Sequence, residues 1–223
     1  FSIAGRCENT GMFGVAITPS SISVGSRCPH ARAGIGAVST QNITDPNRGT
    51  LILDHMETGK DAKTAIDLVV KGRENINFRQ LTAIDKDGNT SHFTGSKILG
   101  TNAVSEKSNC IAAGNLLSNL GVADAMADGF NSDKNSHLGE RLLVGLESGL
   151  KAGGEAGPVH SAALIVVDQT KFPLVDLRVD WEEEDAIPKL RLLWSAYEPQ
   201  MLDYLNRALN PAVAPSYGVA GDL

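Results

Sequence analysis

The stretch that decides the fold is Phe1-Ser-Ile-Ala-Gly-Arg-Cys7, with the returning stretch Met12-Phe-Gly-Val-Ala-Ile-Thr18. Between them lie the turn residues Glu8-Asn9-Thr10-Gly11, and Asn and Gly tolerate the positive φ of a tight hairpin. The sequence therefore predicts two paired strands. A terminus that starts inside a sheet is held in one place, and an α-amino group there titrates near neutrality and can act as a base.

The rest of the chain continues as further strands and as helices gathered in blocks. Residues 34–40 predict a third strand, and residues 78–84 and 90–94 predict a second hairpin. Later strands are expected at residues 109–113, 161–167 and 174–180, and residues 19–33 and 41–49 are expected to be loops. Helical spacing marks residues 51–56, 62–70, 122–130, 138–150 and 185–209, the last interrupted at Pro199.

This order predicts an α+β layered domain rather than alternating βαβ units. Asp61 and Ser136 stand where helix N-caps are expected. We expect one domain over residues 1–197, then a helical extension and loosely ordered tail over residues 198–223.

Composition argues against several classes of partner. The net charge of −6 is unfavourable for nucleic acid, which needs a basic face. No apolar run is long enough to span a membrane. Cys7, Cys28 and Cys110 are widely spaced and odd in number, which favours a reducing compartment, so we expect a cytoplasmic protein.

Common catalytic motifs are missing from the sequence. It contains no phosphate-binding GxxxxGK[ST] loop, which argues against a nucleotide-binding enzyme, and no GxSxG nucleophile elbow. The five histidines show no HxH or HExxH spacing. We therefore expect neither a metal nor a cofactor.

Two short motifs are candidates for chemistry. Arg79, next to Gln80, is either an exposed charge on a hairpin or a guanidinium that orients a carboxylate. Gly114-Asn115 stands where a strand gives way to a segment of helical pattern, so its amide groups could face an oxyanion. Asn115 is equally well explained as a helix cap.

The sequence resembles a family of bacterial proteins called domain of unknown function 1028, which is grouped with the N-terminal nucleophile (Ntn) hydrolases. The resemblance covers about residues 1–194. The residues that carry it are Phe1-Ser-Ile-Ala, Gly14-Val-Ala16, Val24-Gly25-Ser26, Ala31-Arg-Ala-Gly-Ile-Gly-Ala-Val38, Thr40-Gln41, Arg79-Gln80, Asp87-Gly88, Thr94-Gly95, Gly114-Asn115-Leu116-Leu117, Glu140-Arg141-Leu142-Leu143, Gly153-Gly154, Ser161-Ala162-Ala163, Asp176-Leu-Arg-Val-Asp180 and Pro188-Lys-Leu-Arg-Leu-Leu193.

The resemblance implies a four-layer αββα sandwich of two antiparallel sheets, Ntn-hydrolase-like. It also implies hydrolysis of a small amide-containing metabolite by a Thr immediately before Phe1, where family members typically carry one. The Thr hydroxyl would attack and its own amine would take the proton. One departure is Glu155-Ala156 after Gly153-Gly154, where the family often has an acidic and a basic residue.

Site residues are expected at seven positions. Gly114, Asn115, Thr40 and Gln41 are the catalytic candidates, because they could supply an oxyanion hole. Arg32 and Arg79 could hold a substrate carboxylate or orient the amine. Ser2 could line the groove, because side chains two positions apart on a strand share one face.

The alternative function is a catalytically inactive ligand-binding or assembly protein on the same fold. We expect a homo-oligomer in either case. In the assembly protein the contacts would come partly from Met201, Leu202, Leu205 and Leu209.

Overall fold

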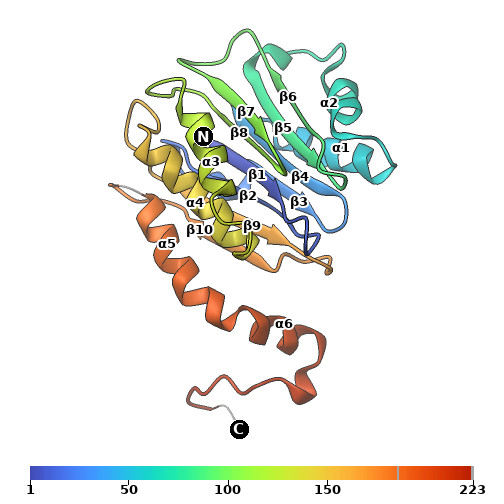
Figure 1. Ribbon diagram of the computed structural model, residues 1–223, viewed down its shortest axis with the longest axis vertical. Helices are drawn as coiled ribbons and strands as arrows, with labels where there is room; N and C mark the ends of the chain where they lie inside the picture. The colour runs from blue at the N-terminus through green and yellow to red at the C-terminus, as the bar shows by residue number, and fades with distance from the viewer. Residues whose placement is uncertain (185, 222–223) are drawn as a thin grey trace.

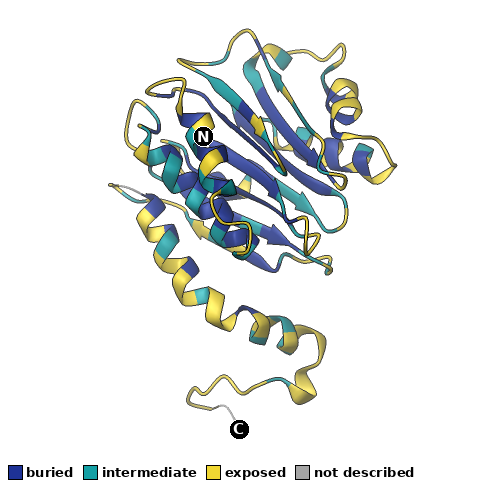
Figure 2. Ribbon diagram, in the orientation of Figure 1, coloured by how far each residue is buried: buried dark blue, intermediate teal, exposed yellow. Residues whose placement is uncertain are grey.

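Two antiparallel β-sheets lie face to face, with helices on both outer sides (Figure 1). The computed structural model describes residues 1–184 and 186–221. The predicted α+β sandwich of four layers is confirmed. Strands are mostly buried, and the outward sides of the helices are exposed (Figure 2).

The larger sheet has six strands in the order β10-β9-β2-β1-β8-β7, every neighbouring pair antiparallel. The predicted first hairpin lies near its centre, with Ser2 opposite Ile17 and Arg6 opposite Phe13. The strands are β1 (Ser2–Arg6), β2 (Phe13–Ile17), β7 (Ala103–Lys107), β8 (Cys110–Gly114), β9 (Ala162–Val167) and β10 (Val175–Val179).

The smaller sheet has four strands in the order β3-β4-β5-β6, again all antiparallel. The predicted second hairpin forms its β5–β6 half. The strands are β3 (Pro29–Arg32), β4 (Gly36–Asn42), β5 (Arg79–Asp85) and β6 (Thr90–Thr94).

Of the six α-helices in the described residues, five pack on the two sheets. α1 and α2 pack on the four-stranded sheet, whereas α3, α4 and α5 pack on the six-stranded sheet (Figure 1). The helices are α1 (Pro46–Glu57), α2 (Ala62–Val70), α3 (Val122–Asn131), α4 (Leu138–Lys151), α5 (Ala186–Tyr197) and α6 (Met201–Leu209).

Alternation along the strands explains why there are three separate apolar cores. Ile3 on β1 packs with residues of α3 and α4, whereas its neighbour Ala4 faces the other sheet. On β4, Ala37 faces between the sheets and Val38 faces α1 and α2. A strand buried on both faces contributes to two cores, and three cores between four layers follow from that pattern.

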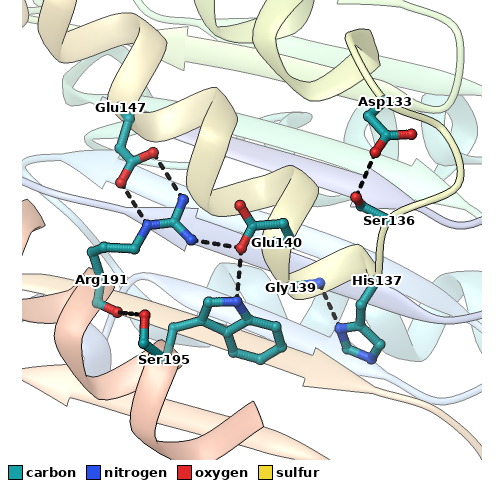
Figure 3. A network of polar contacts seen from close by, with 9 residues as sticks. Asp133, Ser136, His137, Gly139, Glu140, Glu147, Arg191 and Ser195 are labelled. Carbon is teal, nitrogen blue, oxygen red and sulfur yellow. Dashed lines mark hydrogen bonds and ion pairs between the residues drawn. The ribbon is translucent and has the colours of Figure 1, made fainter. Parts of the chain in front are cut away.

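Helix starts follow local capping chemistry. Asp61 accepts a hydrogen bond from the Thr64 backbone N–H at 2.7 Å, which confirms the predicted cap of α2. The predicted cap at Ser136 is wrong, because Ser136 bonds to Asp133 and the Nδ1 atom of His137 accepts from the Gly139 N–H instead (Figure 3).

The start of α1 also differs from the expectation. The helix begins inside the stretch predicted as the loop 41–49, because Asp45 caps its first turn and Pro46 takes the first helical position.

Two strands form that the sequence pattern did not predict. β3 lies within the predicted polar loop 19–33, and β7 precedes the predicted strand at 109–113. Both are edge strands of their sheets, and both are only partly buried. Edge strands carry polar and charged residues that suppress further pairing, so they lack the apolar pattern of a central strand.

The C-terminal segment extends from the body as α5 followed by α6, on either side of the predicted break at Pro199 (Figure 1). Asp185, the first residue of the predicted helix, and residues 222–223 of the predicted tail lie outside the described residues.

An ionic clamp fixes α5 to α4 (Figure 3). The Arg191 guanidinium donates two hydrogen bonds of 2.8 Å to Glu147 and one of 2.5 Å to Glu140. Trp194, buried in the core, donates its indole N–H to Glu140 at 2.8 Å.

Candidate functional site

The start of β1 is buried and bonded on one side. The Phe1 nitrogen donates to the Thr18 carbonyl at 2.9 Å, and the Thr18 N–H donates back to the Phe1 carbonyl at 3.0 Å. The Phe1 ring packs in the core under α3 and α4. These contacts fix the direction of the chain at its first residue.

A carboxylate lies beside this nitrogen. Glu155 Oε1 is 3.6 Å from the Phe1 nitrogen, and the Glu155 side chain is only 5% exposed. Gly153 and Gly154 adopt positive φ after α4, and the Gly153 and Gly154 N–H groups bond back to the Leu150 and Gly149 carbonyls. This turn, which glycine permits, places the Glu155 side chain at the start of β1.

A cavity of about 160 Å³ opens at this point, large enough for a group of a few non-hydrogen atoms. Both sheets and five connecting segments contribute to its wall. The lining residues used below are Phe1, Thr18, Arg27, Cys28, Gln41, Asn115, Leu116 and Glu155.

Electrostatics at the cavity favour an uncharged amine. Burial lowers the pKa of the Phe1 amino group, while the nearby Glu155 carboxylate opposes part of that shift. Burial also raises the pKa of the Cys28 thiol, so this thiol is protonated near neutral pH. A lower pKa increases the neutral fraction of an amine, which is the form that can act as a general base.

Two predicted catalytic residues meet in the cavity. Asn115 is 8% exposed, and its side-chain amide makes no hydrogen bond to another described residue. Gln41 lies across from it on β4, donates to the Gln80 side chain at 2.9 Å and leaves its buried Oε1 without a partner. Buried polar groups are usually hydrogen-bonded, so the unpaired side-chain atoms of Asn115 and Gln41 indicate room for a polar ligand.

The other two catalytic candidates do not line the cavity but contact residues that do. Gly114 is packed so closely on Phe1 that a Cβ there would come within 2.9 Å of the Phe1 Cβ. The Thr40 hydroxyl lies 2.7 Å from that of Thr44, a cavity residue.

The helix-cap explanation of Asn115 is wrong, because α3 begins at Val122 with Gly121 at its cap. Leu116, next to Asn115, has a positive φ of 53°, a strained conformation for a leucine at the cavity wall.

The three predicted substrate-binding residues lie outside the cavity lining. Ser2 is fully buried between the sheets, and its hydroxyl has no partner among the described residues. Arg32 forms ion pairs with Asp54 and Glu57 of α1. Arg79 donates to the carbonyl of Ile43.

Sequence reasoning missed Glu155, Thr18, Cys28 and Arg27. Glu155 carried a usable signal, since it follows two glycines after a helix. Thr18 and Cys28 carried none, because only the pairing of distant segments brings them to Phe1.

Across the described residues, no group of three or more His, Cys, Asp and Glu side chains could hold a metal ion. None of the described helices has the length and apolar character needed to cross a membrane.

A family model described as "Family of unknown function (DUF1028)" matches residues 1–190. The chain belongs to this family. A crystal structure of a protein from Silicibacter pomeroyi, assigned to the same family, is similar at a TM-score of 0.84 and 27% identity, covering 91% of this chain and 88% of that chain.

Two further structures are more distant. Anbu (ancestral beta-subunit) from Yersinia bercovieri has a TM-score of 0.39 at 11% identity, covering 91% of this chain and 96% of that chain. Anbu from Hyphomicrobium sp. strain MC1 has a TM-score of 0.39 at 12% identity, covering 90% and 96%. No curated protein matches the chain.

Proposed function

We propose that the protein is an Ntn-type amidohydrolase that cleaves a small amide-containing metabolite at the cavity beside Phe1. The nucleophile is a Thr immediately before Phe1, as the family resemblance implies. The observation that carries the proposal is the buried, hydrogen-bonded Phe1, which lines one cavity together with Asn115 and Glu155.

Strand alternation supports this placement. Phe1 and Ile3 face the helices, so Ser2 and the residue before Phe1 face the other sheet. Gln41 of that sheet lines the cavity. Consecutive Cα atoms are about 3.8 Å apart, a spacing short enough for the hydroxyl and amine of a preceding Thr to reach this cavity.

The chemistry follows from these positions. The Thr hydroxyl attacks the amide carbonyl of the substrate, and the terminal amine accepts its proton. The Asn115 amide donates to the oxyanion, and Glu155 orients the amine. The amine then protonates the leaving group, and water hydrolyses the ester that remains on Thr.

Substrate size and charge follow from the wall. The small volume favours an acyl group of a few non-hydrogen atoms. Because Arg32 and Arg79 lie away from the cavity, we assign recognition of a substrate carboxylate to Arg27, the guanidinium that lines it.

Arg27 already donates to the carbonyls of Ile22 and Ser23 and to the Ser21 hydroxyl. These bonds hold the guanidinium in place for a planar contact.

The test compares chains that begin Thr-Phe1 and Ala-Phe1 on a panel of small amides, measured by release of ammonia or amine. We expect turnover only with Thr, and partial activity with Ser. Intact mass after quenching should show an acyl adduct on the first residue. Equal turnover by the Ala chain would rule out this mechanism.

The second candidate is a non-catalytic assembly protein, and exposed leucines in the C-terminal segment, residues 198–223, favour it. Of the predicted contact residues, Leu202 and Leu209 are each 61% exposed, whereas Met201 is buried in the core and Leu205 packs against it. We propose that these side chains contact a second copy of the chain. Removing residues 198–223 should lower the mass in light scattering, and an unchanged mass would exclude this role.

A further inference from the structure

The cavity beside Phe1 has polar groups in its buried wall and two leucines where it opens to solvent. Gln41 and Asn115 are the buried amides of that wall. The lining residues that are exposed carry no charge, and they are Ser20, Ser21, Leu99 and Leu116. We call Leu99 and Leu116 the leucine rim. The proposed amidase chemistry uses neither of them.

Backbone hydrogen bonds hold the leucine rim in place. The Leu116 N–H donates to the Leu99 carbonyl at 3.0 Å, and the Leu99 N–H donates to the Asn42 side chain at 3.1 Å. Leu99 belongs to residues 95–102, which connect β6 of one sheet to β7 of the other. The two side chains are therefore positioned before a ligand arrives, and this lowers the entropic cost of binding.

The leucine rim is exposed at a cost to the fold. Leu99 is 47% exposed and Leu116 is 37% exposed. The φ of 53° at Leu116 lies in the left-handed region, where a leucine is rare. A Cβ at Gly100 would lie 3.0 Å from the Leu116 Cδ2 atom, so this glycine leaves room for the leucine. A strained backbone that keeps an apolar side chain at an open cavity indicates contact with a ligand.

We propose that the leucine rim binds an apolar substituent on the nitrogen of the scissile amide, so that the substrates are secondary amides with an alkyl or aryl amine as leaving group. This inference rests on the proposed amidase function, which places the acyl group in the cavity. With a volume of about 160 Å³, the cavity holds an acyl group and little more. The leaving amine therefore extends through the opening, where Leu99 and Leu116 can remove its apolar surface from water.

The opening is less suited to two other kinds of leaving group. A primary amide would release ammonia and would leave the leucine rim in water. An amine with its own carboxylate would need a cation at the opening, and none of the exposed lining residues is charged. Burial of one methylene raises affinity by about fourfold, and by about twofold at a surface that stays half open.

The first test measures binding to the chain that begins Ala-Phe1, so that no turnover occurs. The probes are the N-methyl, N-butyl and N-benzyl monoamides of succinic acid, whose acyl group carries the carboxylate assigned to Arg27. By calorimetry, the Kd of the N-butyl probe should be about eightfold lower than that of the N-methyl probe, because three methylenes are added. Equal Kd values, or no detectable binding of the N-butyl probe, would overturn the proposal.

Variants of the leucine rim test which side chains provide this preference. Leu99→Gln and Leu116→Asn each remove one apolar side chain, and Asn tolerates a positive φ. Each variant should reduce the preference for butyl over methyl to about twofold to threefold. Leu68→Gln on α2 is the matched control, because Leu68 is 42% exposed and does not line the cavity, and it should keep the full preference. A full preference in both rim variants would contradict the assignment.

Two further measurements separate ligand binding from a structural role. The urea midpoint of Leu116→Asn should equal or exceed that of wild type, because Asn relieves the strain at this position. A lower midpoint together with an unchanged preference would make Leu116 a structural residue. A lower mass of Leu99→Gln in light scattering, again with an unchanged preference, would assign the leucine rim to a contact between copies of the chain. Either result would overturn the proposal.

Turnover distinguishes this inference from the proposed function. The chain that begins Thr-Phe1 should hydrolyse the N-butyl probe with a kcat/KM at least about eightfold above that of the N-methyl probe. Turnover with equal kcat/KM for the two probes would refute the leucine rim as a subsite and leave the amidase function standing. A binding preference that depends on Leu99 and Leu116, without turnover of any probe, would refute the amidase function and retain the apolar subsite.

Discussion

The contact between α4 and α5 allows a quantitative prediction. Replacing Arg191 with Met removes the paired hydrogen bonds to Glu147 and the single bond to Glu140 while keeping the apolar stem. The side chains are 27%, 36% and 29% exposed, in the order Arg191, Glu147, Glu140. Exposed ion pairs contribute about 0.2–1 kcal/mol to stability, and hydrogen bonds to buried charges contribute about 1.5–3 kcal/mol. The half-buried contacts of Arg191 belong between these two ranges.

After this discount for solvent screening, each carboxylate contact contributes about 1 kcal/mol. Arg191→Met should therefore lower the free energy of unfolding by about 2 kcal/mol, with a fall in Tm of about 4–8 °C for a domain of this size. Trp194 keeps its bond to Glu140, so the core beneath α5 stays packed.

The assay is urea unfolding at pH 7 of wild type, Arg191→Met, Glu147→Gln and the double variant. The coupling between Arg191 and Glu147 should be about 1 kcal/mol. Lys63→Met is the matched control, because Lys63 and Asp67 form an exposed ion pair, and its Tm should not change measurably. Coupling close to zero, or equal Tm shifts for both Met variants, would refute the reasoning.

Three further outcomes are expected. Asp85→Ala should lower the free energy of unfolding in urea by about 2–4 kcal/mol, because the buried carboxylate accepts from the N–H groups of Ala62 and Asn89 at 3.0 Å; a loss below about 1 kcal/mol would contradict this. Asn115→Ala should leave the urea midpoint nearly unchanged and lower kcat by about 10²–10³-fold on a hydrolysed amide; unchanged kcat would remove Asn115 from the oxyanion site. Burial lowers the pKa of His137, so its contribution to stability is present above about pH 6.5 and is lost as the pH falls. His137→Asn, which keeps a capping side chain, should flatten the dependence of urea midpoint on pH between 7 and 5, and an unchanged slope would contradict this.

Sequence patterns predicted the parts of the fold that depend on local chemistry. The first hairpin, the second hairpin and the Asp61 cap of α2 each need only neighbouring residues, and the structure has all three. The edge strands β3 and β7 were not predictable in this way, since each is held in place by one central neighbour. Their register comes from tertiary pairing, which the local pattern does not encode.

The candidate site likewise combines residues that the sequence identified with a residue that only tertiary packing brings to the site. Asn115 and Gln41 stand at the ends of strands. Asn115 was identified from a short motif, and Gln41 became a candidate through the family resemblance. Glu155 reaches Phe1 only because α4 packs on β1 and β2, so the chain returns to the start of the sheet. A residue whose position depends on the packing of a whole layer leaves little trace in its local sequence.

The central claim concerns the residue before Phe1. The most direct test is intact mass and terminal sequencing of the protein expressed without a tag from its native gene. The account predicts a mature chain that begins Thr-Phe-Ser-Ile, with a free amine and hydroxyl at the cavity. A mature chain that begins at Phe1, or that retains the initiator Met, would contradict it, because no nucleophilic terminus would then enter the site.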